Sequence, residues 1–235
     1  MNIFILIITA FLPAFVVLLQ ALKTKAPPVF MLIAFFAVAA VLFPVRFFQM
    51  ISRFFTQTLL HISAFYSDFF TRFFNSFITA ALIEEGCKTG VFILLSIYMQ
   101  HCCKKSNTTV LPYHCLLTAF FFGCLFSGFE NISYNIRYPQ FQFLRICTAS
   151  VLHGALGNFY FKILHTKTQT AAIGIFLAAV GLHGCYNFFA ALGGWFMLPA
   201  LAVIGLTLMA AGNTVQKITA SNRKTKELKD ARNTI

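Results

Sequence analysis

The chain has 235 residues, of which 59% are hydrophobic and 10% are charged, and its mean hydropathy is +0.78. Soluble domains are typically about a quarter charged, so this composition excludes an ordinary soluble protein. The net charge of +12 does not indicate a nucleic acid partner, because six of the eighteen basic residues lie between Lys217 and Arg232 and most others flank apolar blocks. We therefore expect a protein that lies in the lipid bilayer and binds no nucleic acid.

The apolar blocks have the length of about 20 residues that a helix needs to cross the hydrocarbon of a bilayer. They predict an all-α fold, a polytopic transmembrane helical bundle with about seven spans at 3–22, 29–45, 74–97, 113–134, 143–164, 170–192 and 195–211. Between the second and third spans, residues 46–73 mix apolar and polar side chains with a helical period. This pattern predicts an interfacial amphipathic helix, and a short eighth span is the alternative.

The basic residues predict the domain ends and the orientation. We expect one transmembrane domain over 1–212, with a core at 74–192, followed by a basic cytoplasmic tail at 213–235. The first, third and fifth connectors and the tail hold twelve Lys and Arg residues, whereas the N-terminus and the other connectors hold five. Because Lys and Arg are enriched on the cytoplasmic side, we expect the N-terminus outside and the C-terminus inside.

Four consecutive predicted spans carry ionisable side chains, although a charge at the centre of a span costs about 2.5 to 3.5 kcal/mol. These residues are Glu84, Glu85 and Lys88 on the third span, Glu130 on the fourth, His153 on the fifth and His183 on the sixth. Counted from the outer end of each span, all four groups fall in the outer half of the membrane at similar depths. We therefore expect them to form one hydrated site rather than separate polar contacts between helices.

The spacing within each span supports this convergence. Lys88 follows Glu84 by four residues and Glu85 by three, so that it can reach both carboxylates. Asn131 and Asn187 extend the polar stripes of the fourth and sixth spans. Small residues that permit close approach of the fourth and fifth spans are Gly123, Ser127, Ser150, Gly154 and Gly157.

Four short motifs occur here in the order found in a known family. The sequence "EEGCK" at 84–88 fits EExxK, "FSGFEN" at 126–131 fits FxxxEN, and "HGALGN" from His153 and "HGCYN" from His183 are similar to two histidine motifs. Over about 74–189 the chain resembles the PrsW family of intramembrane proteases, which is related to the type II CAAX prenyl endopeptidases and the Abi bacteriocin-immunity proteins. The prenyl endopeptidases carry EExxxR and FxxxH instead, so a prenylated substrate is not expected.

The resemblance implies a multi-pass protease of the bacterial inner membrane. Its substrate would be a single-pass membrane protein of the anti-sigma-factor kind, and the cut would be the first, site-1 cleavage near the extracytoplasmic face. The residues that we expect in the active site are Glu84, Glu85, Lys88, Glu130, Asn131, His153, His183 and Asn187.

Two mechanisms are compatible with these residues. In the first, Glu84 or Glu85 is the general base that activates water, while Asn187 and one histidine serve the oxyanion and the proton transfer. In the second, a glutamate of the EExxK motif is again the base, and the ligands of a catalytic Zn²⁺ are His153, His183 and Glu130.

Two other functions are alternatives to a protease. An ion or solute transporter also uses buried Glu and His relays, but it needs access from both faces, and the inner halves of these spans carry few ionisable groups. A non-catalytic immunity or binding protein of the membrane would keep the same residues without hydrolysing a substrate.

Overall fold

The computed structural model describes residues 3–60, 68–105, 111–137 and 142–233, and within these ranges it contains helices and no strand. The elements are α1 (Ile3–Lys23), α2 (Pro28–Leu60), α3 (Asp68–Phe74), the π-helix η2 (Asn75–Leu82), α4 (Ile83–Lys105), α5 (Pro112–Arg137), α6 (Gln142–His165), α7 (Gln169–Leu192), the short 3₁₀ helix η3 (Gly194–Phe196) and α8 (Met197–Asn233). The predicted all-α helical bundle is confirmed.

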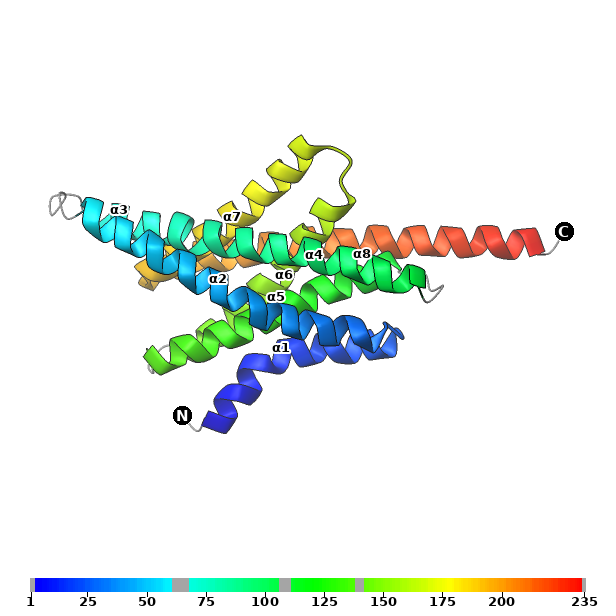
Figure 1. The fold of residues 1–235 in the computed structure, drawn as a ribbon, viewed down its shortest axis with the longest axis horizontal. Coiled ribbons are helices and arrows are strands. Elements are labelled where there is room, and N and C mark those ends of the chain that lie inside the picture. The colour runs from blue at the N-terminus through cyan, green and yellow to red at the C-terminus, as the bar shows by residue number, and fades with distance from the viewer. Residues whose placement is uncertain (1–2, 61–67, 106–110, 138–141, 234–235) are drawn as a thin grey trace.

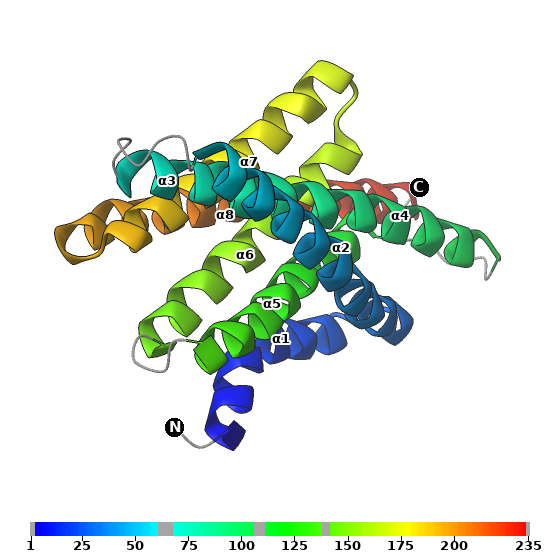
Figure 2. The same ribbon diagram turned by 60° about the vertical axis from the view of Figure 1, so that its left-hand side comes forward.

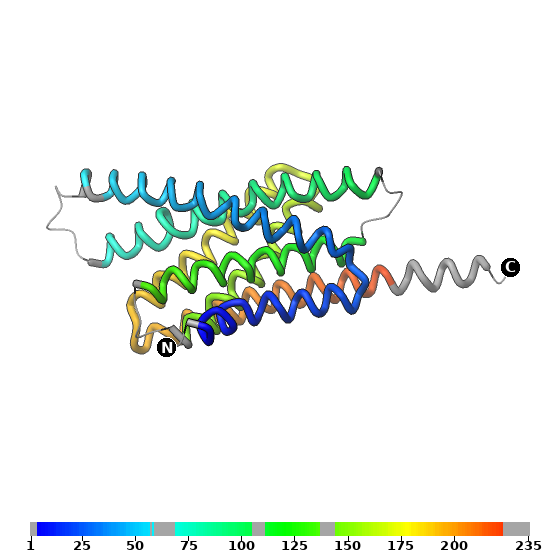
Figure 3. The backbone as a smooth tube through the Cα atoms, turned by 60° about the horizontal axis from the view of Figure 1, so that its bottom comes forward, coloured from blue at the N-terminus to red at the C-terminus, as the bar shows by residue number. Residues whose placement is uncertain are grey.

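Consecutive passes of the chain run back and forth through the bundle. The two chain ends lie at opposite ends of it (Figure 1, Figure 3). α3, η2 and α4 follow one another without a loop and form a single pass. Figure 2 shows α5 and α6 side by side, and α5 also packs against α1 and α2, so α5 is the central helix. α8 continues as one helix from the last predicted span into the basic tail, as far as Asn233.

Five helices of the described chain are long and apolar enough to cross a membrane, at Phe4–Lys23, Pro28–Thr56, Pro112–Ile136, Gln169–Leu192 and Gly194–Asn222. They correspond to five of the seven predicted spans. The other two predicted spans also form helices, but α4 contains two glutamates in its first turn and α6 contains Arg145 and Lys162, which lowers their hydropathy. Apolar side chains such as Phe43, which is 78% exposed, cover the outside of the bundle, as contact with lipid requires.

The predicted interfacial helix over 46–73 is not a separate element. α2 continues without a break as far as Leu60, and α3 begins at Asp68. Residues 61–67 lie outside the described residues. The segment is therefore divided between the end of one pass and the beginning of the next.

The separate helix was predicted because polar and charged residues interrupt the apolar residues of 46–73 at a helical period. Pro44 lies inside α2 and does not end it. Arg46, two residues later, is half-buried and donates hydrogen bonds to Gln49 and to Ser133 of α5. The charge thus points into the bundle, where polar partners hold it, instead of marking the end of a span.

Glycines bring α5 and α6 together, as the small-residue stripes predict. A Cβ atom on Gly123 would overlap the carbonyl oxygen of His153, and one on Gly157 would overlap the backbone of Ala119. Small residues permit this close approach of helix backbones in a membrane. It also brings Glu130 of α5 to within 3.1 Å of His153 of α6.

Candidate active site

Glu85 of α4 lies at the centre of the site and is fully buried. Its Oε1 atom accepts hydrogen bonds from the Lys88 ammonium and from Nδ1 of His183 on α7, the latter at 2.8 Å. Its Oε2 atom accepts a hydrogen bond of 2.7 Å from the hydroxyl of Tyr160 on α6. One carboxylate therefore joins three helices, and both of its oxygens have partners.

Lys88 links this carboxylate to the second histidine. Its Nζ atom lies 3.1 Å from Nδ1 of His153 and 4.4 Å from the centre of the Phe126 ring. Because an ammonium group can only donate, Nδ1 of His153 accepts and its Nε2 carries the proton. That Nε2 donates to Oε2 of Glu130 at 3.1 Å, and Arg145 donates to the other oxygen of Glu130 at 2.9 Å.

Glu84 differs from its neighbour because one of its oxygens has no partner. Oε1 accepts a hydrogen bond of 2.9 Å from Gln49 of α2. Oε2 is buried and, within the described residues, makes no hydrogen bond. It lies 3.8 Å from Nζ of Lys88 and 3.9 Å from Nε2 of His183, which are too distant for hydrogen bonds.

A metal ion fits this cluster of side chains. Glu84, His153 and His183 each offer a ligand atom, and these three atoms lie within 4.8 Å of one another. Two imidazoles and a carboxylate are a donor set typical of catalytic zinc. The unpartnered oxygen of Glu84 also favours a bound cation.

The acid in this set differs from the sequence prediction. We predicted Glu130 beside the two histidines, whereas the three atoms that lie close together belong to Glu84 and the histidines. Glu130 instead contacts the outer nitrogen of His153 and forms an ion pair with Arg145. A carboxylate on the far nitrogen of a histidine is the usual arrangement around a metal ligand, and Glu85 stands in the same relation to His183.

A cavity of about 1170 Å³ opens above the cluster, and we call it the polar cavity for the charged, amide and hydroxyl side chains in its mixed lining. It is lined by the second half of α2, by α3 and η2, by the end of α5 and the start of α6, and by the end of α7. These segments lie at the end of the bundle where α1 begins. Glu84, Glu130 and Asn187 line the cavity, whereas the other predicted residues of the cluster are buried beneath it.

The two predicted asparagines occupy different places. Asn187 lines the cavity one helical turn after His183. Asn131 is buried between α5 and α6, where its amide nitrogen donates to Ser127 at 3.2 Å and to Ser150 at 3.1 Å. Asn131 therefore joins two helices, and no hydrogen bond of the described residues connects it to the carboxylates or histidines.

The sequence prediction missed two partners of the glutamates. Gln49 lies on the same face of α2 as the buried Val41 and Val45, at helical spacing, so its burial was detectable once α2 was known to continue. Tyr160 follows His153 by seven residues, which is two turns of α6, and its hydroxyl reaches Glu85. Gln49 and Tyr160 could thus have been found from their positions on a helix face, and not from their residue types.

The π-helix η2 sets the direction of the glutamates that follow it. It has eight residues, and its buried Ser76 and Thr79 line the cavity. Hydrogen bonds from i to i+5 rotate the following residues relative to an α-helix, and such turns are frequent at functional sites. At its other face, Gly184 of α7 leaves room for the ring of Phe77, because a Cβ there would overlap it.

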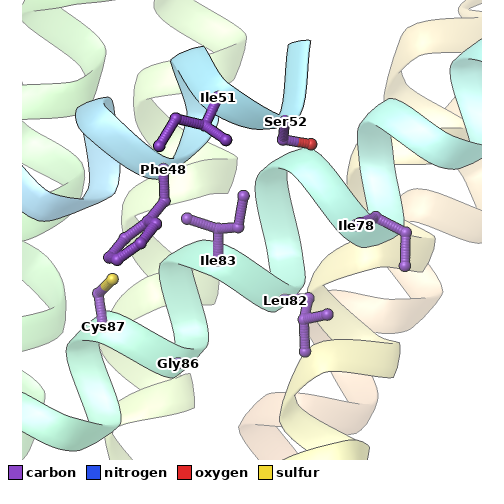
Figure 4. A pocket seen from close by; sticks show the side chains of 8 residues that line it. All are labelled: Phe48, Ile51, Ser52, Ile78, Leu82, Ile83, Gly86 and Cys87. Atoms are coloured by element: carbon purple, nitrogen blue, oxygen red, sulfur yellow. The ribbon is translucent and has the colours of Figure 1, made fainter. Parts of the chain in front are cut away.

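A shallow apolar groove of about 430 Å³ lies between α2 and the junction of η2 with α4 (Figure 4). Phe48, Ile78 and Ile83 are among its lining residues. Ser52 also lines it, and the Ser52 hydroxyl lies 2.8 Å from that of Thr79, which lines the polar cavity. This hydrogen bond separates the apolar groove from the polar cavity.

The comparisons with known proteins agree with this site. The family model described as PrsW family intramembrane metalloprotease matches residues 27–211, which is most of the chain and includes all the residues of the cluster. No curated protein and no solved structure matches. The chain belongs to the PrsW family, and it is an intramembrane protease.

Proposed function

We propose that this protease cuts single-pass membrane proteins in the polar cavity, with a Zn²⁺ ion held by Glu84, His153 and His183. The observation that carries the proposal is the meeting of these three side chains beneath the cavity, where one oxygen of Glu84 has no other described partner. A buried, unpartnered carboxylate oxygen costs free energy that a bound cation would recover.

The surrounding residues would hold the histidines in the right state. Glu85 accepts a hydrogen bond from the Nδ1–H of His183 and leaves Nε2 as the ligand atom. The ligand atom of His153 would be Nδ1, so a bound ion would replace the hydrogen bond that this nitrogen accepts from Lys88. Tyr160 and Lys88 fix Glu85 in turn. When bound, the zinc ion supplies a Lewis acid that activates water and polarises the peptide carbonyl.

Two residues that line the cavity would act on the substrate. Glu130 is the carboxylate beside the ligand set, and we assign it to accept the proton of the attacking water and to deliver it to the leaving amine. Asn187 would donate its amide to the oxyanion that forms at the cleaved carbonyl. Both roles need a side chain in the cavity wall, and both residues line the cavity.

The proposed cut is made near the extracytoplasmic face of the bacterial inner membrane. The cavity opens at the end of the bundle that holds five basic residues, while the opposite end and the tail hold twelve. This distribution supports an extracytoplasmic cavity, an external N-terminus and an internal C-terminus. From the resemblance of the motifs we further propose site-1 cleavage of an anti-sigma-factor-like regulator as the reaction.

The metal and the reaction are tested together on the purified full chain in lipid nanodiscs. The substrate is a single-pass test protein with a tagged external domain, and zinc content is measured by mass spectrometry. We expect Glu84→Gln to lose both zinc and cleavage, and Asn187→Ala to keep zinc while cleavage falls by about 10²- to 10³-fold. Treatment with 1,10-phenanthroline should stop cleavage until zinc is restored. Full activity of the metal-free protein would overturn the proposed zinc site, and cleavage by Glu84→Gln would overturn the assignment of the site.

The regulator substrate is tested in cells that express either the wild type or the Glu84→Gln variant. Membrane fragments that depend on the wild type are identified by mass spectrometry. We expect one of them to derive from a single-pass protein whose cytoplasmic part binds a sigma factor, cut on its external side. Fragments cut on the cytoplasmic side would contradict the orientation.

A further inference from the structure

The basic residues of this chain are sorted by type between the two ends of the bundle. At the end where the cavity opens, all five basic residues are arginines, namely Arg46, Arg53, Arg72, Arg137 and Arg145. At the other end and in the tail, ten of the twelve basic residues are lysines. Lysines at helix ends serve topology and contact with lipid headgroups equally well, so topology does not explain a preference for arginine at one end.

Four of these arginines line the cavity, and three of them lack a described carboxylate partner. Arg145 pairs with Glu130. Arg46 donates to an amide oxygen and a hydroxyl, and Arg72 donates to a backbone carbonyl at 2.5 Å. Arg53 is exposed and makes no ion pair with the described residues. With four arginines against Glu84 and Glu130, the lining of the cavity therefore carries positive charge in excess.

Arginine differs from lysine in the anions that it suits. Its planar guanidinium presents five N–H donors in a fork that binds a carboxylate through two parallel hydrogen bonds. Arg46 and Arg72 have donors left beyond their described hydrogen bonds, and Arg53 is exposed at the cavity. An acidic segment of a substrate would present several carboxylates of this kind, so the arginines suit such a segment.

We propose that the cavity recognises its substrate by Asp and Glu residues in the segment next to the transmembrane helix, and that Arg53 and Arg72 bind them. This inference rests on the proposed function, because Glu84 lies in the same cavity and would meet the neighbouring peptide bond. At about 1170 Å³ the cavity exceeds the 300 to 1000 Å³ usual for small-molecule pockets, so it has room for a peptide segment.

The lining of the cavity favours a peptide over an anionic lipid. Thr56, Asn75 and Thr79 are among many hydroxyl and amide side chains that could bond a peptide backbone. A lipid would also need an apolar channel for its acyl chains. The neighbouring apolar groove (Figure 4) is lined by Ser52, whose hydroxyl bonds that of Thr79 in the cavity wall, so this hydrogen bond lies between the groove and the cavity. A phospholipid headgroup is therefore an outcome of the test rather than the proposed ligand.

The test measures binding and needs no proteolysis. A short fluorescein-labelled peptide rich in Glu, and the same peptide with Gln in place of each Glu, are titrated against the full chain in phosphatidylcholine nanodiscs by fluorescence anisotropy. We expect the Glu peptide alone to bind, and Arg53→Gln with Arg72→Gln to weaken it about tenfold or more, since each variant removes a charge-assisted hydrogen bond. Lys104→Gln with Lys217→Gln, at the opposite end, is the matched control and should leave binding unchanged.

Three results would overturn the inference. The first is equal binding of the two peptides, and the second is an equal loss of binding in the arginine and the lysine variants. The third is loss of Glu-peptide binding when phosphatidylglycerol is added to wild-type nanodiscs, which would identify the ligand as lipid. Arg53→Lys provides a second variant at an exposed position, and it should bind more weakly than the wild type because it keeps the charge but loses the fork. Binding that persists in Glu84→Gln, which is expected to be inactive, separates this inference from the proposed reaction.

Discussion

Lys88→Met removes the one cation buried among the glutamates of α4. The ammonium contacts Glu85 and His153 and lies 3.8 Å from Glu84, and it is fully buried. Met keeps the length and the packing of the side chain but leaves the carboxylates without this charge. Removing one partner of a buried ion pair costs about 3 to 5 kcal/mol. We expect a loss of this size in the free energy of unfolding, measured with zinc removed so that a bound ion does not compensate.

The assay is unfolding of the purified chain in mixed micelles by increasing SDS, followed by far-ultraviolet circular dichroism. Lys162→Met is the matched control, because Lys162 is half-buried near the end of α6 and its Nζ lies 5.5 Å from the Phe159 ring. Its change should stay within about 0.5 kcal/mol. Adding Glu85→Gln to Lys88→Met removes one stranded charge and should restore at least half of the lost stability. Equal SDS midpoints for the two lysine variants would refute this account of the site.

Three further changes test neighbouring parts of the structure. Tyr160→Phe leaves a buried carboxylate oxygen without its hydroxyl donor and should lower stability by about 1.5 to 3 kcal/mol, measured in the same SDS titration; an unchanged midpoint would contradict the hydrogen bond. Gly157→Val should destabilise the chain because its Cβ would overlap the backbone of Ala119, whereas Gly174→Val, with open space around it, is the control; equal effects would exclude close packing of α5 and α6. Asn187→Ala should leave the SDS midpoint within about 0.5 kcal/mol of wild type despite its loss of cleavage, because its side chain lines the cavity; a large drop would mean a packing role.

The convergence of the polar residues was predictable because hydropathy and helical period are local properties of the chain. Span ends and counts along a helix place Glu84, Glu130, His153 and His183 in one layer, and these residues do lie together. The glycine stripes predicted the close approach of α5 and α6, since a missing Cβ has the same consequence in any helix pair.

The rotation of each helix about its axis was not predictable in the same way. Glu84 and Glu85 point about 100° apart on a helix, so a small rotation decides which of them faces the cavity. The preceding π-helix sets that rotation through hydrogen bonds that apolar periodicity does not reveal. For this reason the sequence did not show that Glu84 has an open oxygen while both oxygens of Glu85 have partners. It also did not identify Gln49 as the partner of Glu84.

The hydrogen-bond partners of Glu84 and Glu85 distinguish a carboxylate open to a ligand from one that holds its neighbours. Several buried polar atoms of the described chain lack hydrogen bonds, including the hydroxyls of Thr89 and Ser96, but Glu84 Oε2 is the one carboxylate oxygen among them. A neutral hydroxyl without a partner costs little compared with a carboxylate oxygen in the same setting. Glu85, one residue away, has every oxygen bound. Glu85 therefore receives three hydrogen-bond donors, whereas Oε2 of Glu84 lies at the cavity without one among the described residues. This oxygen stays available for a ligand that enters through the cavity.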